Sequence, residues 1–347
     1  MCHAKRGTRV GDAGEQAMTE KETCWAISDG AAGNERQVLA LARALGHVPR
    51  VLRVSLREPW AMLAPRFTLA ARSAIREQDG GDISPPWPSL AIGCGRRAAL
   101  LTRLLRESSD GRTTTIQILD PRISSSRFDY VITPQHDAMP GENVIRTIGA
   151  LNPVDDAWLF QARANHAHFA DFAGSRHGVL IGASNRAQRI DAEYCKGLIE
   201  QCRAMHANEG GSFLVTVSRR TSPDVSDFLR SAFAALPGMF WAGPDDGDNP
   251  YAGILAWADR LIVTPDSVNM ISEACATGRP VWTYAPKPII GKLAGFHAEL
   301  IAAGYLRPLG DTHPRPAIAP LRETAAVAEL IQNRRRIAAE KAVRMYR

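Results

Sequence analysis

The chain has 347 residues, 45% of them hydrophobic, which is enough for two domains that each bury their own core. No apolar run reaches the roughly 20 residues that cross a bilayer, and six scattered cysteines without zinc-ligand spacing indicate free thiols in a cytoplasmic protein. The net charge of +6 suits an anionic small molecule or an anionic membrane surface, while the lack of basic residues interleaved with aromatics argues against nucleic acid as a partner.

Residues 1–22 hold no apolar segment of a secretory signal and are expected to be disordered. From residue 23 onward, strand and helix patterns alternate. Predicted strands lie at 24–28, 50–55, 89–93, 114–119 and 130–133, with helices at 35–45 and 96–106. Short connections of this kind are typical of a parallel sheet covered on both faces. We therefore predict an N-terminal Rossmann-like domain over residues 23–165.

The alternation resumes in the second half of the chain. Predicted strands lie at 179–181, 213–217, 239–241, 261–263 and 281–284, with helices at 189–206, 225–236 and from Asp266 or Ser267 to Ala276. Residues 166–322 are predicted to form a second Rossmann-like domain that faces the first across a cleft. In the C-terminal segment 323–347, a helix at 324–346 carries Val327, Leu330 and Ile331 on one face and should pack back on the body.

The loop after the first strand, Ser28-Asp-Gly-Ala-Ala-Gly-Asn34, can bind a ligand. Gly30 and Gly33 let backbone amides approach an anion or a sugar, and the following helix N-terminus adds partial positive charge near Asn34. Asp29 is a candidate catalytic carboxylate in this loop. An equally good interpretation is a tight turn in which Asp29 and Asn34 are local caps.

The segment Gly93-Cys-Gly-Arg-Arg-Ala98 matches the pattern GxGxxA between a strand and a helix. It is the third strand-to-helix turn, however, and no convincing acidic partner follows about 20 residues later. We therefore favour close helix–strand packing, with an anion contact at Gly95 and Arg96, over binding of a dinucleotide.

Two further loops of the first domain, Asp120-Pro-Arg122 and Thr133-Pro-Gln-His-Asp137, each follow a strand and should meet at one edge of the sheet. His136 could act as a base that Asp137 orients, which makes both residues catalytic candidates. Neighbouring residues in a loop do not face each other by default, so an ordinary polar loop is the alternative interpretation.

Two loops of the second half are equivalent in position. One contains Ser184 and Asn185 after a strand, and the other contains Arg219 and Arg220 between a strand and a helix. Paired arginines in that place suit a diphosphate. A solvated pair of surface arginines is the alternative interpretation.

The segment 259–285 has the pattern of a complete strand–loop–helix–strand unit. Such a unit presents a polar loop and a helix N-terminus at the carboxyl edge of a parallel sheet, where open α/β folds bind ligands. The same unit in GT-B glycosyltransferases holds a nucleotide-sugar. The residues that would hold ribose and sugar hydroxyls here are Asp266, Ser267, Ser272 and Glu273, and Asn269 is a further ligand-binding candidate of the same unit.

The segment 57–76 mixes large apolar residues with four arginines and one glutamate. It suits an amphipathic stretch that rests on anionic lipid, which would place the protein peripherally on the inner face of a membrane. An ordinary helix that covers the first sheet, with its apolar face in the core, is the other interpretation. The two differ in exposure, since docking requires Trp60 and Phe67 at the surface.

Several segments together resemble the mitochondrial fission (elongated mitochondria) protein-like family. They include WAISDGAAGNERQVLALARALG, IGCGRRAALLTRLL, FDYVITPQHD, NVIRTIGALNPV and VTPDSVNMISEACATGRPV, and they extend from about Trp25 to Ala285. The resemblance implies an α/β, GT-B-like fold, with the nucleotide-sugar on the second domain and the acceptor on the first. It implies no established reaction. The epimerase label that bacterial members commonly carry fits poorly, because the N-terminal GxxGxxG loop and Tyr-x-x-x-Lys pair of short-chain epimerases are lacking.

Two functions therefore compete. The first is a protein that binds a nucleotide-sugar in the interdomain cleft and acts as a glycosyltransferase without a metal or cofactor, since positive side chains and helix N-termini can stabilise the leaving group. The second is a non-catalytic interaction protein that keeps the fold and acts at a membrane surface. Titration with nucleotide-sugars discriminates between them.

Overall fold

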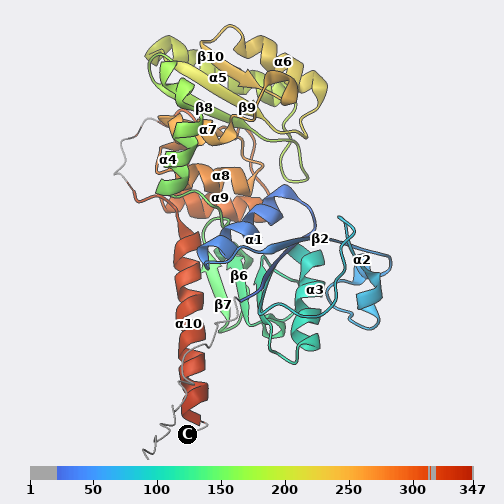
Figure 1. Cartoon of the computed structure of the whole chain (residues 1–347). Coiled ribbons are helices and arrows are strands. Elements are labelled where there is room, and N and C mark those ends of the chain that lie inside the picture. Colours follow the sequence, from blue (N-terminus) through green and yellow to red (C-terminus); the bar gives the residue numbers. More distant parts are fainter. Residues whose placement is uncertain (1–21, 312, 314–317, 346–347) are drawn as a thin grey trace, which may run out of the picture.

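The computed structural model describes residues 22–311, 313 and 318–345, so the predicted disorder of residues 1–21 lies outside the described residues. Two α/β units are stacked one above the other, and a long C-terminal helix runs along the lower unit (Figure 1). Each unit is built on a largely parallel sheet. The predicted fold of two Rossmann-like sheets is thereby confirmed.

The first sheet has seven strands in the order β3-β2-β1-β4-β5-β6-β7. All neighbours are parallel except β3, which pairs antiparallel with β2. The strands are β1 (Cys24–Ser28), β2 (Arg50–Leu56), β3 (Ile75–Glu77), β4 (Leu90–Cys94), β5 (Thr114–Ile118), β6 (Tyr130–Pro134) and β7 (Val144–Thr147). Its helices are α1 (Ala32–Ala44), α2 (Trp60–Leu63) and α3 (Gly95–Ser108).

The second sheet has six parallel strands in the order β10-β9-β8-β11-β12-β13. They are β8 (Arg176–Ile181), β9 (Ser212–Val217), β10 (Gly238–Trp241), β11 (Arg260–Val263), β12 (Val281–Thr283) and β13 (Arg307–Pro308). Its helices are α4 (Asp156–Asn165), α5 (Ala192–Glu209), α6 (Pro223–Phe233), α7 (Tyr251–Trp257), α8 (Val268–Ala276) and α9 (Lys292–Ala302). Strand order reverses between β1 and β4 and between β8 and β11, the two places where such folds form a ligand crevice.

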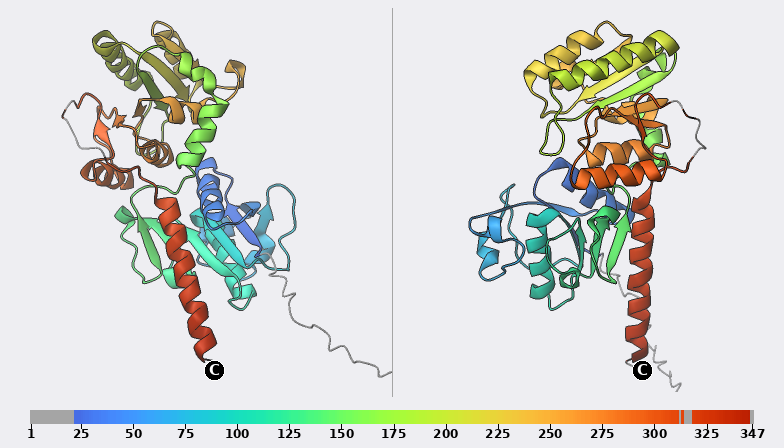
Figure 2. Two further views of the ribbon diagram at one scale, coloured as in Figure 1. Left: turned by 60° about the vertical axis from the view of Figure 1, so that its left-hand side comes forward. Right: turned by 180° about the vertical axis from the view of Figure 1, so that it is seen from behind.

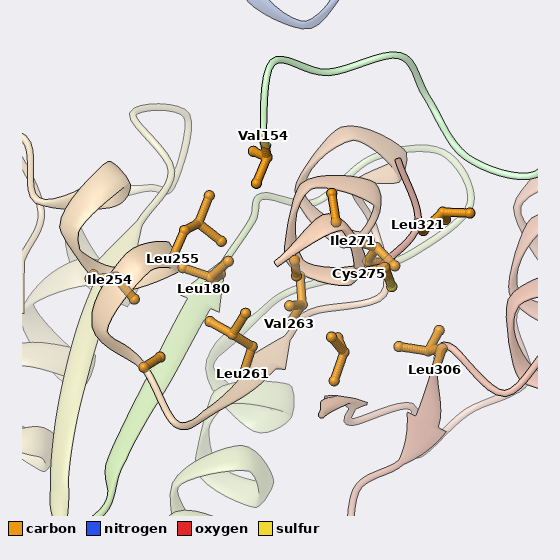
Figure 3. Packing of buried hydrophobic residues seen from close by; sticks show 14 of the residues in the cluster. Val154, Leu180, Ile254, Leu255, Leu261, Val263, Ile271, Cys275, Leu306 and Leu321 are labelled. Carbon is orange, nitrogen blue, oxygen red and sulfur yellow. The ribbon is translucent and has the colours of Figure 1, made fainter. Parts of the chain in front are cut away.

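The helix α4 belongs to the second unit, although the sequence placed the boundary after residue 165. Its Leu159 packs in the same core as Ile254 of α7 and Leu180 of β8. Figure 3 shows Val154, just before α4, in the same cluster as Leu180 and Ile254. The chain therefore crosses to the second unit near Pro153, before α4 begins.

The helix α10 (Glu323–Met345) returns the chain to the first unit and runs down beside it (Figures 1 and 2). The Glu323 carboxylate accepts the backbone N–H groups of Ile148 and Gly149 at 2.8 and 2.7 Å. Val327 and Ile331 are buried in the first core, which confirms the predicted packing on the body. Leu330 was expected on that face but is 38% exposed, because the contact covers only one side of the helix.

None of the helices in the described ranges is both long and apolar enough to span a bilayer.

Candidate functional site: the interdomain cleft

A cleft of about 1120 Å³ opens between the carboxyl edges of the two sheets. The first unit contributes loop residues such as Gly95 and His136, and the second contributes Asn185, Asp266 and Lys292. Both strand-order reversals face this space, since Gly95 directly follows β4 and Asp266 follows β11. The cleft therefore occupies the position that open α/β sheets use for ligands.

Lys292 at the start of α9 bridges two acidic side chains of the first unit. Its Nζ donates to Asp137 Oδ1 at 2.5 Å and lies 3.9 Å from Asp120 Oδ2. The Asp137 carboxylate is nearly buried, whereas Lys292 remains more than half exposed to the cleft. This ion pair ties the second unit to the loop after β6 and leaves a cation on the cleft wall.

His136 has a carboxylate partner, but it is not Asp137 as the sequence suggested. The ring Nδ1 lies 3.3 Å from Glu299 Oε2 on α9, and Phe296 packs edge-on against the ring. A carboxylate can only accept, so Nδ1–H is the donor in this contact and Nε2 is not engaged by Glu299. Asp137 instead receives Lys292 and a 3.4 Å bond from the Thr133 hydroxyl. The predicted pairing of a histidine with a carboxylate therefore exists, but the carboxylate is Glu299 of the second unit.

Glu273 was expected to reach ribose or sugar hydroxyls, but its carboxylate is already occupied. The residue is 1% exposed, and Arg36 Nη1 on α1 donates to both oxygens at 2.7 and 2.8 Å. The Tyr251 hydroxyl donates to Oε2 as well. Burial would lower the pKa of Arg36, but the charge and hydrogen bonds of Glu273 raise it above the usual value. The ion pair of Arg36 with Glu273 therefore links α1 of the first unit to α8 of the second.

The other predicted residues of α8 divide between the cleft and the domain contact. Ser267 is the N-cap, accepting the N–H of Met270 at 3.3 Å. Asn269 lines the cleft and accepts a 3.4 Å bond from Gln37 of α1. Ser272 is fully buried and accepts the N–H of Ala150 at 2.9 Å, so it serves the domain contact and does not reach the cleft.

Asp266 lies in the cleft wall and is buried. It accepts the Thr264 hydroxyl at 2.6 Å and the Ala183 N–H at 3.0 Å. A Cβ at Gly182 would lie 2.1 Å from Asp266 Oδ2, so only glycine allows this approach. Burial raises the pKa of Asp266, although both hydrogen bonds and the charge of Arg220 lower it in part. The side chain is consequently a more weakly acidic carboxyl than usual.

In the loop after β1, Asp29 forms local hydrogen bonds that close a tight turn, as the alternative interpretation of the sequence predicted. Its Oδ1 accepts the Ala31 N–H at 3.1 Å and the Asn34 side-chain amide at 3.0 Å, which closes the turn. Gly30 lies against Gln78 and away from the cleft. Gly33 packs on Asn269, whose amide would lie 2.1 Å from a Cβ there. Of this loop, Asn34 lines the cleft.

Gly95 and Arg96 both border the cleft at the start of α3. Arg96 was expected to contact an anion, but its guanidinium donates to the carbonyl groups of Ala61 at 2.9 Å and Met62 at 3.1 Å. A guanidinium has five N–H donors and can therefore bind several backbone carbonyls at once. Arg96 thus holds the segment around α2 against α3.

The loops after β8 and β9 carry the remaining candidates. Ser184 accepts the Ile190 N–H at 2.9 Å and so closes its own loop, and Asn185 lines the cleft while its amide donates to the Asp266 carbonyl at 3.0 Å. Arg219 and Arg220 are exposed, and neither forms an ion pair with a residue that the structure describes. Neither arginine is among the residues that line the cleft, and Arg219 borders a separate cavity of about 170 Å³ beside Trp241 and Tyr251.

Several residues of the site were not predicted from the sequence. They are Arg36, Tyr251, Lys292 and Glu299. Tyr251 begins the short helix α7 and Lys292 begins α9, and neither helix was predicted. Lys292 directly follows Gly291, and that glycine after a proline-rich loop was the available signal for a helix start.

His297 on α9 holds the loop between β11 and α8. Its Nε2 donates to the Pro265 carbonyl at 2.9 Å. Burial lowers the pKa of His297 below its usual 6.5, although this hydrogen bond opposes the effect. The folded state therefore binds the proton less readily than the unfolded chain. The neutral ring stabilises the fold above pH 6.5, and this stability is lost as the pH falls through the lowered pKa.

We expect His297→Gln to flatten the pH dependence of stability, because the amide still donates to Pro265 but does not titrate. Urea unfolding between about pH 7 and pH 5 should show the wild type losing stability faster, by at most about 1.4 kcal/mol per pH unit for one proton. His177 also has a pKa lowered by burial, but it is present in both proteins and cancels in the difference. Parallel curves for the two proteins would contradict the assignment.

Two Rossmann-like sheets with a cleft between their carboxyl edges define a protein of the GT-B type. The fold is similar to UDP-GlcNAc 2-epimerase from Methanocaldococcus jannaschii, crystallised with UDP-GlcNAc and UDP, with a TM-score of 0.53 and 12% identity over 90% of this chain and 100% of that one. It is also similar to MurG from Acinetobacter baumannii, with a TM-score of 0.50 and 13% identity over 90% and 100% of the two chains. At these identities the similarity concerns the fold alone.

The chain belongs to the family Mitochondrial fission ELM1, which matches residues 32–335. It is 32% identical over 280 residues to mitochondrial fission protein ELM1 of Arabidopsis thaliana, an alignment that covers 73% of this chain and 64% of that protein. The chain thus spans less than two thirds of that relative's length. A protein of Rickettsia prowazekii (strain Madrid E), RP120, is 25% identical over 89% of this chain and 97% of its own length. The family resemblance seen in the sequence is confirmed.

Proposed function

We propose that the protein binds a nucleotide-sugar in the interdomain cleft, with the nucleotide on the second unit. The observation that carries the proposal is the cleft of about 1120 Å³, which is lined by the loops after β-strands of both sheets. The similar 2-epimerase was crystallised with UDP-GlcNAc and UDP, which supports a ligand of this class.

The nucleotide would lie on the loops after β8, β9 and β11. Arg219 and Arg220 are exposed and form no ion pair within the described residues, so they can pair with a diphosphate. The adjoining cavity of about 170 Å³ beside Trp241 and Tyr251 offers an aromatic wall of a size that suits a base. Glu273 lies behind this cavity, bound to Tyr251 and Arg36. A ribose hydroxyl would compete with Arg36 for that carboxylate.

The reaction that we propose is glycosyl transfer without a metal or cofactor. Nε2 of His136 would accept the proton of an acceptor hydroxyl while Glu299 holds Nδ1–H. The hydroxyl oxygen bonds to the anomeric carbon of the sugar as the bond from that carbon to the diphosphate breaks, and a nucleoside diphosphate leaves. Arg219, Arg220 and the N-terminus of α8 would stabilise the negative charge on the leaving group.

Titration with UDP-, GDP-, ADP- and CMP-sugars tests the binding. We expect one nucleotide series to release heat and to raise the melting temperature, because a ligand at about 100 times its Kd adds about 2.7 kcal/mol to the stability of the folded state. The double variant Arg219→Gln/Arg220→Gln should bind at least tenfold more weakly, about 1.4 kcal/mol. A matched control is Arg112→Gln/Arg127→Gln, which removes two exposed arginines of the first unit. No heat and no stabilisation with any nucleotide-sugar would refute the proposal.

A second candidate is a non-catalytic interaction protein that keeps the fold. It is favoured by the sequestered state of Glu273, which binds Arg36 and Tyr251 in place of a ligand, and by the family's name. Incubation with a bound nucleotide-sugar and a panel of acceptors discriminates between the two. Release of a nucleoside diphosphate supports the transferase, whereas binding without any product under all conditions supports the interaction protein.

A further inference from the structure

We propose that the segment 57–76 is a docking surface for an anionic lipid bilayer. Three of its large apolar side chains project into solvent: Met62 is 73% exposed, Phe67 56% and Leu69 88%. The segment lies around α2, at the edge of the first unit and on the side away from α10 (Figure 1). Exposed apolar side chains gathered in one short segment indicate an interaction surface.

The backbone of this segment is held in place, so the exposure does not come from a loose loop. Arg96 donates to the carbonyls of Ala61 and Met62, and Arg103 donates to those of Pro65 and Arg66, both at 3.1 Å. These bonds turn the main chain toward α3. The side chains of Met62 and Phe67 consequently project away from the core.

The docking interpretation of the sequence requires Trp60 at the surface, but its side chain is only partly exposed. It is half-buried against the separate core between the first sheet and α3, and its indole N–H donates to the Leu69 carbonyl at 3.1 Å. Ala71 and Ile75 are buried in the same core. The expected helix over the whole segment is not formed, since α2 covers only Trp60–Leu63. One set of side chains nevertheless anchors the segment in the core, and another faces outward.

The charged residues around the apolar side chains indicate that the bound surface is an anionic bilayer. Arg57, Arg66, Arg72 and Arg76 are all exposed, against the single acidic residue Glu58 of the segment. Arg57, Arg66 and Arg76 form no ion pair within the described residues, and Arg72 stacks on Trp87. Apolar side chains inserted at the interface, with arginines that reach lipid phosphates beside them, are the features that hold a protein on an anionic leaflet.

The same segment also borders the cleft, because Met62, Leu63 and Phe67 line both the exposed patch and the cleft wall. If the proposed transfer reaction is correct, its acceptor is then an amphiphile anchored in the bilayer. Its lipid portion would lie along Met62 and Phe67 while its hydroxyl reaches His136. Bilayer binding itself does not depend on that reaction.

Vesicle sedimentation tests the docking surface directly. The vesicles are pure phosphatidylcholine, or phosphatidylcholine with about one third phosphatidylglycerol, at low and physiological salt. We expect the wild type to bind the anionic vesicles, more strongly at low salt, and the neutral ones at least about tenfold more weakly. Met62→Ser/Phe67→Ser/Leu69→Ser should abolish binding, and Arg57→Gln/Arg66→Gln/Arg76→Gln should remove the preference for anionic lipid.

The matched control is Val48→Ser/Phe160→Ser, which removes two strongly exposed apolar side chains outside the segment and should bind as the wild type does. Circular dichroism and thermal melting of each variant report whether it is folded. Lack of wild-type binding at low salt, equal loss in the control, or unchanged binding by the folded triple serine variant would each overturn the proposal. Nucleotide-sugar titration of the wild-type protein without vesicles is a separate readout, so failure of one proposal does not mimic failure of the other.

Discussion

Replacing Arg36 by methionine should lower the free energy of unfolding by about 2 kcal/mol. Glu273 is 1% exposed, so without Arg36 its carboxylate keeps, among the residues that the structure describes, only the Tyr251 hydroxyl as a side-chain donor. Removing one partner of a fully buried ion pair costs about 3–5 kcal/mol, and the Arg36 side chain is 45% exposed, which reduces that figure. Methionine keeps the apolar stem, so the loss reports the charge. Urea unfolding measures it, and Arg43→Met on the same helix is the control, with almost no change expected.

A double-mutant cycle separates the ion pair from the packing. Arg36→Met/Glu273→Gln should recover at least about 1 kcal/mol relative to the sum of the single changes, because the neutral amide no longer needs the cation. Strict additivity would show that the Arg36–Glu273 ion pair does not couple the two units.

Since Arg36 occupies both oxygens of Glu273, Arg36→Met should also tighten nucleotide-sugar binding if that carboxylate accepts ribose hydroxyls.

Replacing His136 by glutamine should lower kcat of the proposed transfer by about 10²–10⁴-fold while KM for the nucleotide-sugar changes little. His136 lines the cleft and Glu299 engages its Nδ1, and the amide nitrogen of glutamine cannot replace Nε2 as a base. Glu299→Gln should give a smaller loss, because a neutral partner still accepts Nδ1–H but no longer stabilises the protonated ring. Nucleoside diphosphate release at saturating nucleotide-sugar is the assay.

The control for this experiment is His168→Gln, an exposed histidine of the second unit away from the cleft. It should leave kcat unchanged. Full activity of His136→Gln would remove the base from the proposed mechanism, and Asp137 would then be the remaining candidate of that loop. Equal losses in the His136 and His168 variants would indicate a general effect on folding.

The architecture was predictable from local sequence patterns. Fully buried parallel strands such as β1 and β4 appear as short continuous apolar runs, and glycine and polar residues mark where each ends. The helix α8 was expected from Asp266 or Ser267 onward, and Ser267 is its N-cap in the structure. The helices α4, α7 and α9 were not predicted from the sequence. In α7, four of the seven residues are buried and the other three are partly buried, so no polar face alternates with an apolar one.

The sequence by itself determined which loops follow strands, and hence that their polar residues meet at two sheet edges. That information is local, because strand period, caps and breakers act over a few residues. Only the tertiary structure decided the partners of those residues. Arg36 reaches Glu273 across 237 positions of sequence, and Lys292 reaches Asp137 across 155. Such pairs arise because the second sheet is stacked on the first, and the charge on a residue does not specify which distant carboxylate its side chain meets.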